Sequence, residues 1–300
     1  MTREADAAGW DAVWVGDSVV AKPRLEAMTT LAYMAGITNT VRLGTAVLLP
    51  SLRQPVIMAQ LLANVDQISR GRLVLGLGVG WSLPSAEMEW AACGMNHGRR
   101  ARLLEEQISV WRELWSGEPV THRGEDVDLQ EHTIGPLPWR PEGPPVLITA
   151  GNRGELIPAQ LERFGRLGDG IITTYVHVEE IPVIRERAAE ALVRHGRGRR
   201  EFPLCVYTTV RLDDDVRTAQ RVTSEFLATY YGGGVHERGA MGLGPAPVVT
   251  ELLGRYAAAG VTDLCVRFIG HDQQAQLERF TAEVLPGFRA AHPAGERSAR

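Results

Sequence analysis

Cysteine is scarce in this 300-residue chain, which has only Cys93, Cys205 and Cys265. The number is odd and no C-x-x-C spacing occurs, which argues against a disulfide framework. Cys205 and Cys265 fall in apolar runs that are typical of buried thiols. The eight histidines show no H-E-x-x-H or other ligand spacing, so we expect no metal site.

Long apolar runs and a large excess of one charge are also missing. No stretch is long enough to cross a bilayer, and the N-terminus lacks the apolar core of a secretory signal. The net charge of -4 gives little attraction to nucleic acid or an anionic membrane. We therefore expect a cytoplasmic protein with neither nucleic acid nor membrane as partner. A small-molecule substrate and a homodimeric state are further expectations.

Several nucleotide-binding and hydrolytic motifs are absent. There is no G-x-S-x-G elbow and no phosphate-binding P-loop. Gly76, Gly78 and Gly80 lie within one apolar run, whereas a dinucleotide site needs its glycines in the turn after the strand. Two compatible interpretations remain for these glycines. In one, the strand simply places few side-chain atoms at the centre of a barrel. In the other, the missing side chains leave room for a flat ring system.

The stretch from Val41 to Trp81 organises the chain. It contains two short apolar runs that do not alternate with polar residues, as in strands buried on both faces of a parallel sheet. Between them the sequence predicts a helix that begins near Pro55 and ends at Gly71 in the left-handed conformation. The whole is a right-handed βαβ unit. The predicted apolar stripe of its helix is Ile57, Leu61, Val65 and Ile68.

Strands and helices alternate along the rest of the chain. Seven strands are predicted, each followed by a helix, which is one strand short of a (β/α)₈ barrel; an open doubly wound sheet is the alternative. The predicted strands are 11–16, the two of the βαβ unit, 145–150, 169–174, 204–212 and 263–269. The main helices outside that unit are predicted at 25–36, 85–92, 99–115, 155–167, 179–195, 218–230, 247–259 and 274–289.

One domain is predicted over residues 1–290. Residues 117–144 are rich in glycine and proline and are interpreted as a surface insertion with a short hairpin. Residues 232–244 carry so many glycines that we expect a mobile loop, and 291–300 a disordered tail. Because a helix precedes the strand at 11–16, we expect that the barrel's first strand belongs upstream of a truncated or misassigned start.

Polar side chains at predicted strand ends are the candidates for chemistry. Asp17 follows the first visible strand, at the face where barrel enzymes place catalysis, although a lone aspartate is more often a loop or capping carboxylate. The loop Ala150-Gly151-Asn152-Arg153 could bind a phosphate through its N–H groups, or be an ordinary turn. Arg100 begins a helix and could reach an anion, or be solvated. Arg267 and His271 end the last strand, where a buried arginine usually needs a partner.

The organising stretch resembles the bacterial luciferase-like family. The resemblance rests on Leu-Gly-Thr-Ala-Val-Leu-Leu-Pro, on Arg53-Gln54-Pro55-Val56, on the run from Leu62 to Arg72, and on Leu75-Gly76-Leu77-Gly78-Val79-Gly80-Trp81. Further matches are Trp14-Val15-Gly16-Asp17, the helix from Arg100 to Trp115, and Gly168-Asp169-Gly170. The resemblance extends from about Arg3 to Arg289.

This family implies a barrel that holds reduced FMN or the deazaflavin coenzyme F420 at its C-terminal mouth. It implies a non-proline cis peptide between Ala46 and Val47, and a ring site formed with Gly78. It also implies phosphate contacts at Arg100 and at the loop of Ala150, Gly151, Asn152 and Arg153. Asp17 and Ser18 take the catalytic positions, and Ser18 stands where many members have a histidine that serves as a proton donor.

The prediction is therefore an oxidoreductase that uses a reduced flavin or deazaflavin for monooxygenation or hydride transfer on a small organic substrate. The run Gly16-Asp17-Ser18 and the small residues around Ala46 favour the deazaflavin. In either case the cofactor carries the difficult step, and the protein orients and shields it. The alternative is a degenerate relative that binds flavin without turnover.

Overall fold

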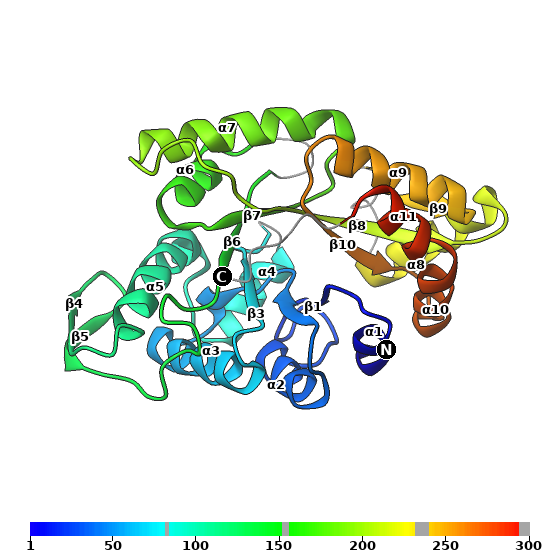
Figure 1. Cartoon of the computed structure of the whole chain (residues 1–300). Coiled ribbons are helices and arrows are strands. Elements are labelled where there is room, and N and C mark those ends of the chain that lie inside the picture. Colours follow the sequence, from blue (N-terminus) through cyan, green and yellow to red (C-terminus); the bar gives the residue numbers. More distant parts are fainter. Residues whose placement is uncertain (82–83, 152–155, 232–239, 294–300) are drawn as a thin grey trace. The chain divides into compact units, whose positions relative to one another are not determined.

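The computed structural model describes residues 1–81, 84–151, 156–231 and 240–293 (Figure 1). Two compact units can be distinguished within the chain. The N-terminal unit comprises Thr2–Thr149 and Glu162–Ile171, and the C-terminal unit comprises Met1, Ala150–Leu161 and Ile172–Arg300. Residues 232–239 of the predicted mobile loop and 294–300 of the predicted tail lie outside the described residues.

All seven predicted strands are present. In the sheet their order is β1-β2-β3-β6-β7-β8-β10, which is also their order along the chain. The registers of β1 with β2, β2 with β3, β3 with β6 and β10 with β8 are all parallel. The predicted α/β class with a parallel sheet is confirmed. The bounds are β1 Ala12–Val15, β2 Arg42–Thr45, β3 Leu73–Leu77, β6 Val146–Thr149, β7 Gly170–Thr174, β8 Leu204–Leu212 and β10 Asp263–Phe268.

A further strand, β9, that was not predicted includes the last three residues of the glycine-rich segment 232–244, while the mobility of this segment stays a prediction. Gly242–Gly244 form this short strand, which pairs in parallel with β8 from Val210 to Leu212. Glycine fits there because a Cβ at Gly242 would lie 3.2 Å from Val210 Cγ2, so the two strands approach closely. Hydrogen bonding to β8 thus fixes residues whose composition alone predicted no regular structure.

Helices of the N-terminal unit match the predicted positions to within a few residues. Figure 1 shows α2 and α3 side by side, and α3 also packs against α5. The hairpin predicted in the insertion is present as antiparallel strands β4 and β5. The bounds are α1 Thr2–Ala7, α2 Ala27–Ile37, α3 Pro55–Ser69, α4 Pro84–Ala92, α5 Arg100–Leu114, β4 Val120–Arg123 and β5 Asp128–His132, with short 3₁₀ turns at Pro50–Leu52 and His97–Arg99.

Helix α3 has the predicted ends but buries a different face. Gly71 has φ 77° and closes the helix as expected. Three residues of the predicted stripe are exposed: Ile57 (58%), Leu61 (36%) and Ile68 (52%). The buried side is Met58, Ala59, Leu62, Ala63, Val65, Asp66 and Ser69. The helix has apolar residues on both sides, so periodicity offered two stripes. The side with more small residues is the buried one.

Trp14 and Gly44 decide how β1 and β2 pack on one face of the sheet. They are register partners, so their side-chain positions point to the same side. A Cβ at Gly44 would lie 2.1 Å from Trp14 Cε3, so only glycine admits the indole. On the opposite face Leu43, Leu73, Leu75 and Leu77 are fully buried. The space left by the missing side chain at Gly44 is therefore occupied by the indole of Trp14 and is not open to a ligand.

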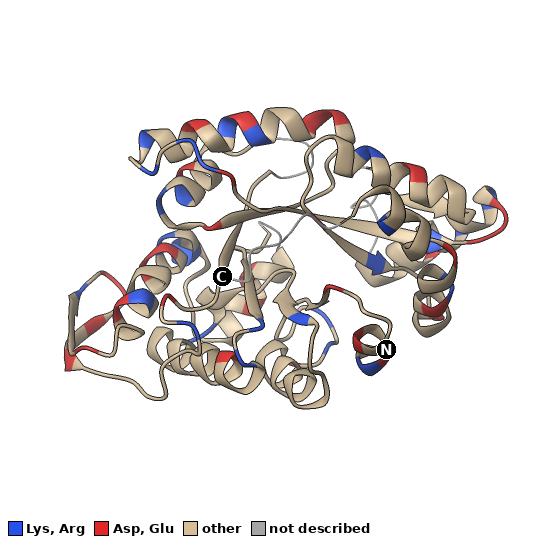
Figure 2. Ribbon diagram, in the orientation of Figure 1, with Lys and Arg blue, Asp and Glu red and all other residues tan. Residues whose placement is uncertain are grey.

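Helices of the C-terminal unit follow its strands. Figure 2 shows positively and negatively charged residues spaced along α7, as expected for a helix with one solvated face. The predicted helix 274–289 is divided at Val284, and a second helix begins at Leu285 with Pro286 in its first turn. The bounds are α7 Ile181–Arg194, α8 Val216–Tyr231, α9 Ala246–Ala258, α10 Gln273–Glu283 and α11 Leu285–Ala291, while α6 Pro158–Leu167 crosses the boundary between the units. None of the helices in the described ranges is both long and apolar enough to span a membrane.

Candidate functional site

The peptide bond between Ala46 and Val47 is cis, as predicted. It lies directly after β2, at the carboxyl end of the strand. The chain then rejoins the sheet, because Leu48 accepts a hydrogen bond from Gly78 N and donates one to Gly76 O. From Leu43 to Leu52 every residue is buried except Ala46 and Val47, which are partly exposed. These two residues thus present an accessible apolar floor at this end of the sheet.

Gly78 supports this floor. A Cβ at Gly78 would lie 2.7 Å from Val47 Cγ2 and 3.4 Å from Thr149 Cγ2. The space left by the missing side chain is occupied by Val47, not by open volume. Gly78 therefore contributes to the predicted ring site indirectly, because it allows Val47 to lie against β3 beside Thr149. We call Ala46, Val47, Gly78 and Thr149 the apolar floor.

Asp17 is buried below the segment that carries the cis bond. Its Oδ2 accepts hydrogen bonds from Leu49 N (3.0 Å) and Arg53 Nη1 (2.7 Å), and its Oδ1 accepts one from Arg53 Nη2 (2.8 Å). The side chain of Asp17 is 0% exposed. Burial acts to lower the pKa of Arg53, but the hydrogen bonds and the charge of Asp17 raise it. This pair holds the chain that follows the floor.

Ser18 is held by Glu89, a buried residue of α4. The Ser18 hydroxyl donates to Glu89 Oε1 (2.7 Å) and accepts from Lys22 N (3.0 Å). The same Oε1 also accepts from the backbone N–H groups of residues 19, 20 and 21, at 2.6, 2.9 and 3.1 Å. One carboxylate oxygen thus orders the whole loop after β1.

The electrostatics of Glu89 follow from these four donors. Burial acts to raise the pKa of Glu89, but the hydrogen bonds from Ser18 and from the backbone of residues 19–21 outweigh it and hold the pKa below its usual range. Glu89 is therefore ionised at neutral pH, and its charge strengthens each of the four bonds.

Glu89 and the role of Arg53 were not predicted from the sequence. A signal for Glu89 existed: it lies three residues after Ala86 and next to Trp90, on the side of α4 that carries both. A charged residue on a buried helix face needs partners. Its partners could not be found from sequence, because they are backbone N–H groups some 70 positions away.

Arg100 is half-buried at the first turn of α5. Its Nη1 donates to His97 O at 2.9 Å and lies 3.5 Å from His97 Nδ1. The His97 ring in turn packs edge-on against Trp90, with 5.3 Å between ring centroids. The contact of Arg100 with a cofactor phosphate stays a prediction.

The predicted phosphate loop is described only at its start. Ala150 is buried and its N–H donates to Ile172 O, which continues the pairing of β6 toward β7. Gly151 has φ 88°, a conformation that glycine adopts without strain. Asn152 and Arg153 lie outside the described residues. The phosphate contacts predicted for this loop stay predictions.

A parallel sheet with helices between its strands, and a prepared surface at the carboxyl ends of those strands, is the arrangement of α/β barrel enzymes. The family is shown by comparison of the sequence. The chain belongs to the luciferase-like monooxygenase family, whose model matches residues 1–276. The predicted family is confirmed, and with it the prediction of an oxidoreductase.

Curated relatives and a solved structure resemble the chain over most of its length. An F420-dependent glucose-6-phosphate dehydrogenase of Kineococcus radiotolerans is 29% identical, over 95% of this chain and 91% of the relative. A 5,10-methylenetetrahydromethanopterin reductase of Archaeoglobus fulgidus is 26% identical, over 83% and 71%. The structure of an F420-dependent secondary alcohol dehydrogenase in complex with an F420-acetone adduct superposes with a TM-score of 0.81 at 20% identity, over 96% and 93%. The last likeness confirms the predicted fold.

Proposed function

We propose that this protein is an oxidoreductase that uses the deazaflavin coenzyme F420 to transfer a hydride to or from a small organic substrate. The observation that carries the proposal is the apolar floor, whose Ala46 and Val47 are partly exposed between fully buried neighbours. The F420-dependent relative from Kineococcus radiotolerans supports the choice of cofactor.

The residues of the floor fit a flat, largely apolar ring. Ala46 and Val47 present small aliphatic side chains, and methyl groups of Val47 and Thr149 both lie next to the side-chain position of Gly78. No charged side chain belongs to the floor, so no ionic group would lose its hydration when a ring covers it. The phosphate contact predicted for Arg100 and the one predicted for the backbone of Gly151 are retained as separate proposals.

When bound, the deazaflavin supplies a carbon that accepts or donates a hydride. The floor would orient the ring and exclude water from one of its faces. Asp17 and Ser18 were predicted as catalytic residues. Their side-chain oxygens bind Arg53, Leu49 N–H and Glu89, so we propose that both act by positioning the floor and the loop after β1.

FMN is the second candidate cofactor, since the family is named for monooxygenases. The floor offers an aliphatic surface to either ring. A relative that binds a flavin without turnover is the remaining alternative. The cytoplasmic location and the absence of a nucleic-acid partner stay predictions.

Redox assays with each cofactor separate these possibilities. Purified protein is mixed with oxidised F420 and a panel of alcohols and sugar phosphates without oxygen, and loss of the F420 absorbance is followed. In parallel, reduced FMN and oxygen are mixed with the protein and the same panel of organic substrates, and an oxygenated product is sought. We expect reduction of F420 and no oxygenated product. Tight binding without turnover of either cofactor would identify the degenerate relative.

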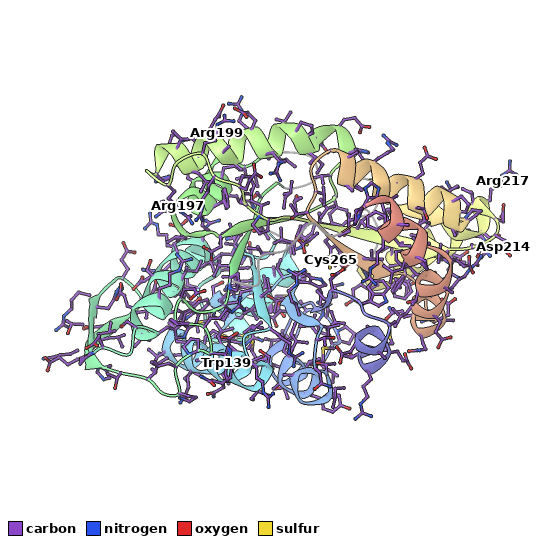
Figure 3. The ribbon with its side chains drawn as sticks, in the orientation of Figure 1. Trp139, Arg197, Arg199, Asp214, Arg217 and Cys265 are labelled. Carbon is purple, nitrogen blue, oxygen red and sulfur yellow. The ribbon has the colours of Figure 1, made fainter. Side chains whose placement is uncertain are left out.

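A homodimer is proposed on the outer face of α2 and α3. Tyr33, Ile57, Leu61, Ile68 and Trp139 are apolar and exposed there, between 36% and 65%. Helix α2 has no charged residue, and the only one in α3, Asp66, is buried. Figure 2 shows both helices almost without charge, and Figure 3 labels Trp139. A second copy of the same uncharged face suits such a surface, because no like charges would oppose each other.

Replacing Ile57 with glutamate should separate the proposed dimer. The change places two like charges in a symmetric apolar contact, where an unpaired charge is costly. Sedimentation at several protein concentrations is the measurement, and we expect the wild type at twice the mass of the variant. Val183→Glu is the control, because Val183 is 53% exposed on α7. A monomeric wild type, or a dimer that survives Ile57→Glu, would contradict this interface.

A further inference from the structure

The carboxyl-terminal half of β10 and the end of α8 form a cationic aromatic cluster in the C-terminal unit. Arg267 Nη1 donates to the Tyr231 hydroxyl at 2.7 Å. The guanidinium carbon lies 5.4 Å from the ring centroid of Tyr230 and 5.3 Å from that of Tyr231. These distances are within the range of cation–π attraction. We call Arg267, Tyr207, Tyr230 and Tyr231 the Arg267 cluster.

Arg267 is half-buried and has no carboxylate partner among the described residues. Two other shielded arginines have more partners: Arg211 pairs with the carboxylate of Asp272 at 2.8 Å, and Arg72 donates five hydrogen bonds, four of them to backbone carbonyls. A guanidinium has five N–H donors, and Arg267 uses one in the described structure. A positive charge shielded from water in this way favours an anion beside it.

Tyr207 adds a second donor to the same face of the sheet. In the parallel register Cys265 is opposite Tyr207 and Arg267 is opposite Thr209, so Tyr207 and Arg267 project to the same side. Cys265, labelled in Figure 3, marks this position on β10. Burial raises the pKa of Tyr207, so its phenol keeps its proton. Its hydroxyl makes no hydrogen bond to another described residue.

Tyr175, which directly follows β7, contributes to the surroundings of Arg267. It has φ 56°, which is uncommon for a residue with a side chain. Burial acts to lower the pKa of Arg267, and the phenols of Tyr207, Tyr231 and Tyr175 raise it. Three tyrosines from different elements therefore lie close enough to influence one guanidinium. Such convergence of polar groups on a cation that has no acidic partner in the described part of the chain is typical of a ligand site.

We propose that the Arg267 cluster binds the anionic group of the substrate, a carboxylate or a phosphate. Arg267 would receive it through its remaining donors, with Tyr207 as an additional donor, while Tyr231 fixes the guanidinium between the two rings. The planar fork of arginine matches both kinds of oxyanion. This inference rests on the proposed function, because it assigns the substrate class of that oxidoreductase. It makes Arg267 a specificity-determining residue.

Binding of inorganic phosphate and of acetate by the protein without cofactor tests the inference. Each anion is titrated against chloride of equal ionic strength, and the thermal unfolding temperature is followed, because a ligand that binds the folded state raises it. We expect Arg267→Gln to weaken binding of at least one of the two anions by a factor of at least ten. Tyr231→Phe should weaken it less, and Arg267→Lys should retain part of it.

Arg185→Gln is the matched control. Arg185 also lies over an aromatic ring, 5.1 Å from that of Phe202, but it already has a carboxylate partner in Glu201. We expect this variant to bind both anions as the wild type does. Equal loss in both variants, or no specific anion binding by the wild type, would overturn the inference.

The cofactor also carries a phosphate, so its affinity is measured in the same variants. We expect Arg267→Gln to bind F420 and FMN like the wild type. A loss of cofactor affinity in Arg267→Gln would assign the cluster to the cofactor and overturn the substrate assignment. The anion titration needs no cofactor and no turnover, so a failure of the proposed function would be seen separately.

Discussion

Replacing Asp17 with alanine is expected to lower the free energy of unfolding by about 3 kcal/mol, the cost of removing one partner of a buried ion pair. The change leaves Arg53, whose side chain is 15% exposed, with only the more exposed Glu26 as acidic partner. It also removes the acceptor of Leu49 N–H. Because the chain after the floor loses its anchor, we expect cofactor binding to fall as well.

Denaturant unfolding and cofactor titration of the same variant measure both effects. Glu26→Gln is the control, since it removes the outer partner of Arg53 at 2.9 Å and keeps an oxygen for the Thr29 N–H. Exposed ion pairs contribute about 1 kcal/mol or less, so this variant should stay close to the wild type. Wild-type stability and affinity in Asp17→Ala would show that Asp17 is an ordinary loop carboxylate.

Replacing Glu89 with alanine is expected to release the loop after β1. Four donors lose one acceptor together, and buried donors without partners cost about 1–3 kcal/mol each. Solvent can reach part of this loop, so we expect a total loss of about 3 kcal/mol, with faster proteolysis at residues 18–22. Cleavage sites identified by mass spectrometry test the location. Unchanged resistance of residues 18–22 to proteolysis would show that Glu89 does not hold this loop.

Glu89→Gln separates the charge of this residue from its shape. The folded-state pKa of Glu89 is lowered, so its charge stabilises the fold above the ordinary glutamate pKa of about 4.3, and this contribution is lost as the pH falls through the lowered value. The stability difference between wild type and Glu89→Gln should therefore be constant near neutral pH and shrink below about pH 4.3. A difference that is independent of pH would mean that the carboxylate charge is irrelevant.

Sequence patterns predicted the strands well because buried parallel strands leave a local signal. Leu73 to Leu77 is an unbroken apolar run, and it forms β3 with every residue buried. The cis bond at Ala46–Val47 was predicted from the family resemblance, not from local preference. Helix α3 shows that hydrophobic periodicity alone does not decide which side of a helix is buried. Its two apolar sides are equivalent in the sequence, and packing against α2 and α5 decides which is buried.

The places of Asp17 and Ser18 in the fold were predicted from the sequence, but their contacts were not. Asp17 and Ser18 were placed correctly at the end of β1, because strand ends can be located from the pattern. Their partners come from residues 36 and 71 positions further along the chain. Such pairings depend on how the sheet folds, and no local spacing encodes them. β9 was missed for the same reason, since its order comes from its neighbour β8.

The claim that the apolar floor binds a deazaflavin ring is tested most directly by fluorescence titration of the protein with F420 and, separately, with FMN. Wild-type protein and Ala46→Glu are compared, because Ala46 is partly exposed and a charge there would oppose an apolar ring. Thermal unfolding of both shows that the variant is folded. We predict that the wild type binds F420 more tightly than FMN and that Ala46→Glu loses at least ten-fold in affinity. Equal F420 affinity in both folded proteins would contradict the account.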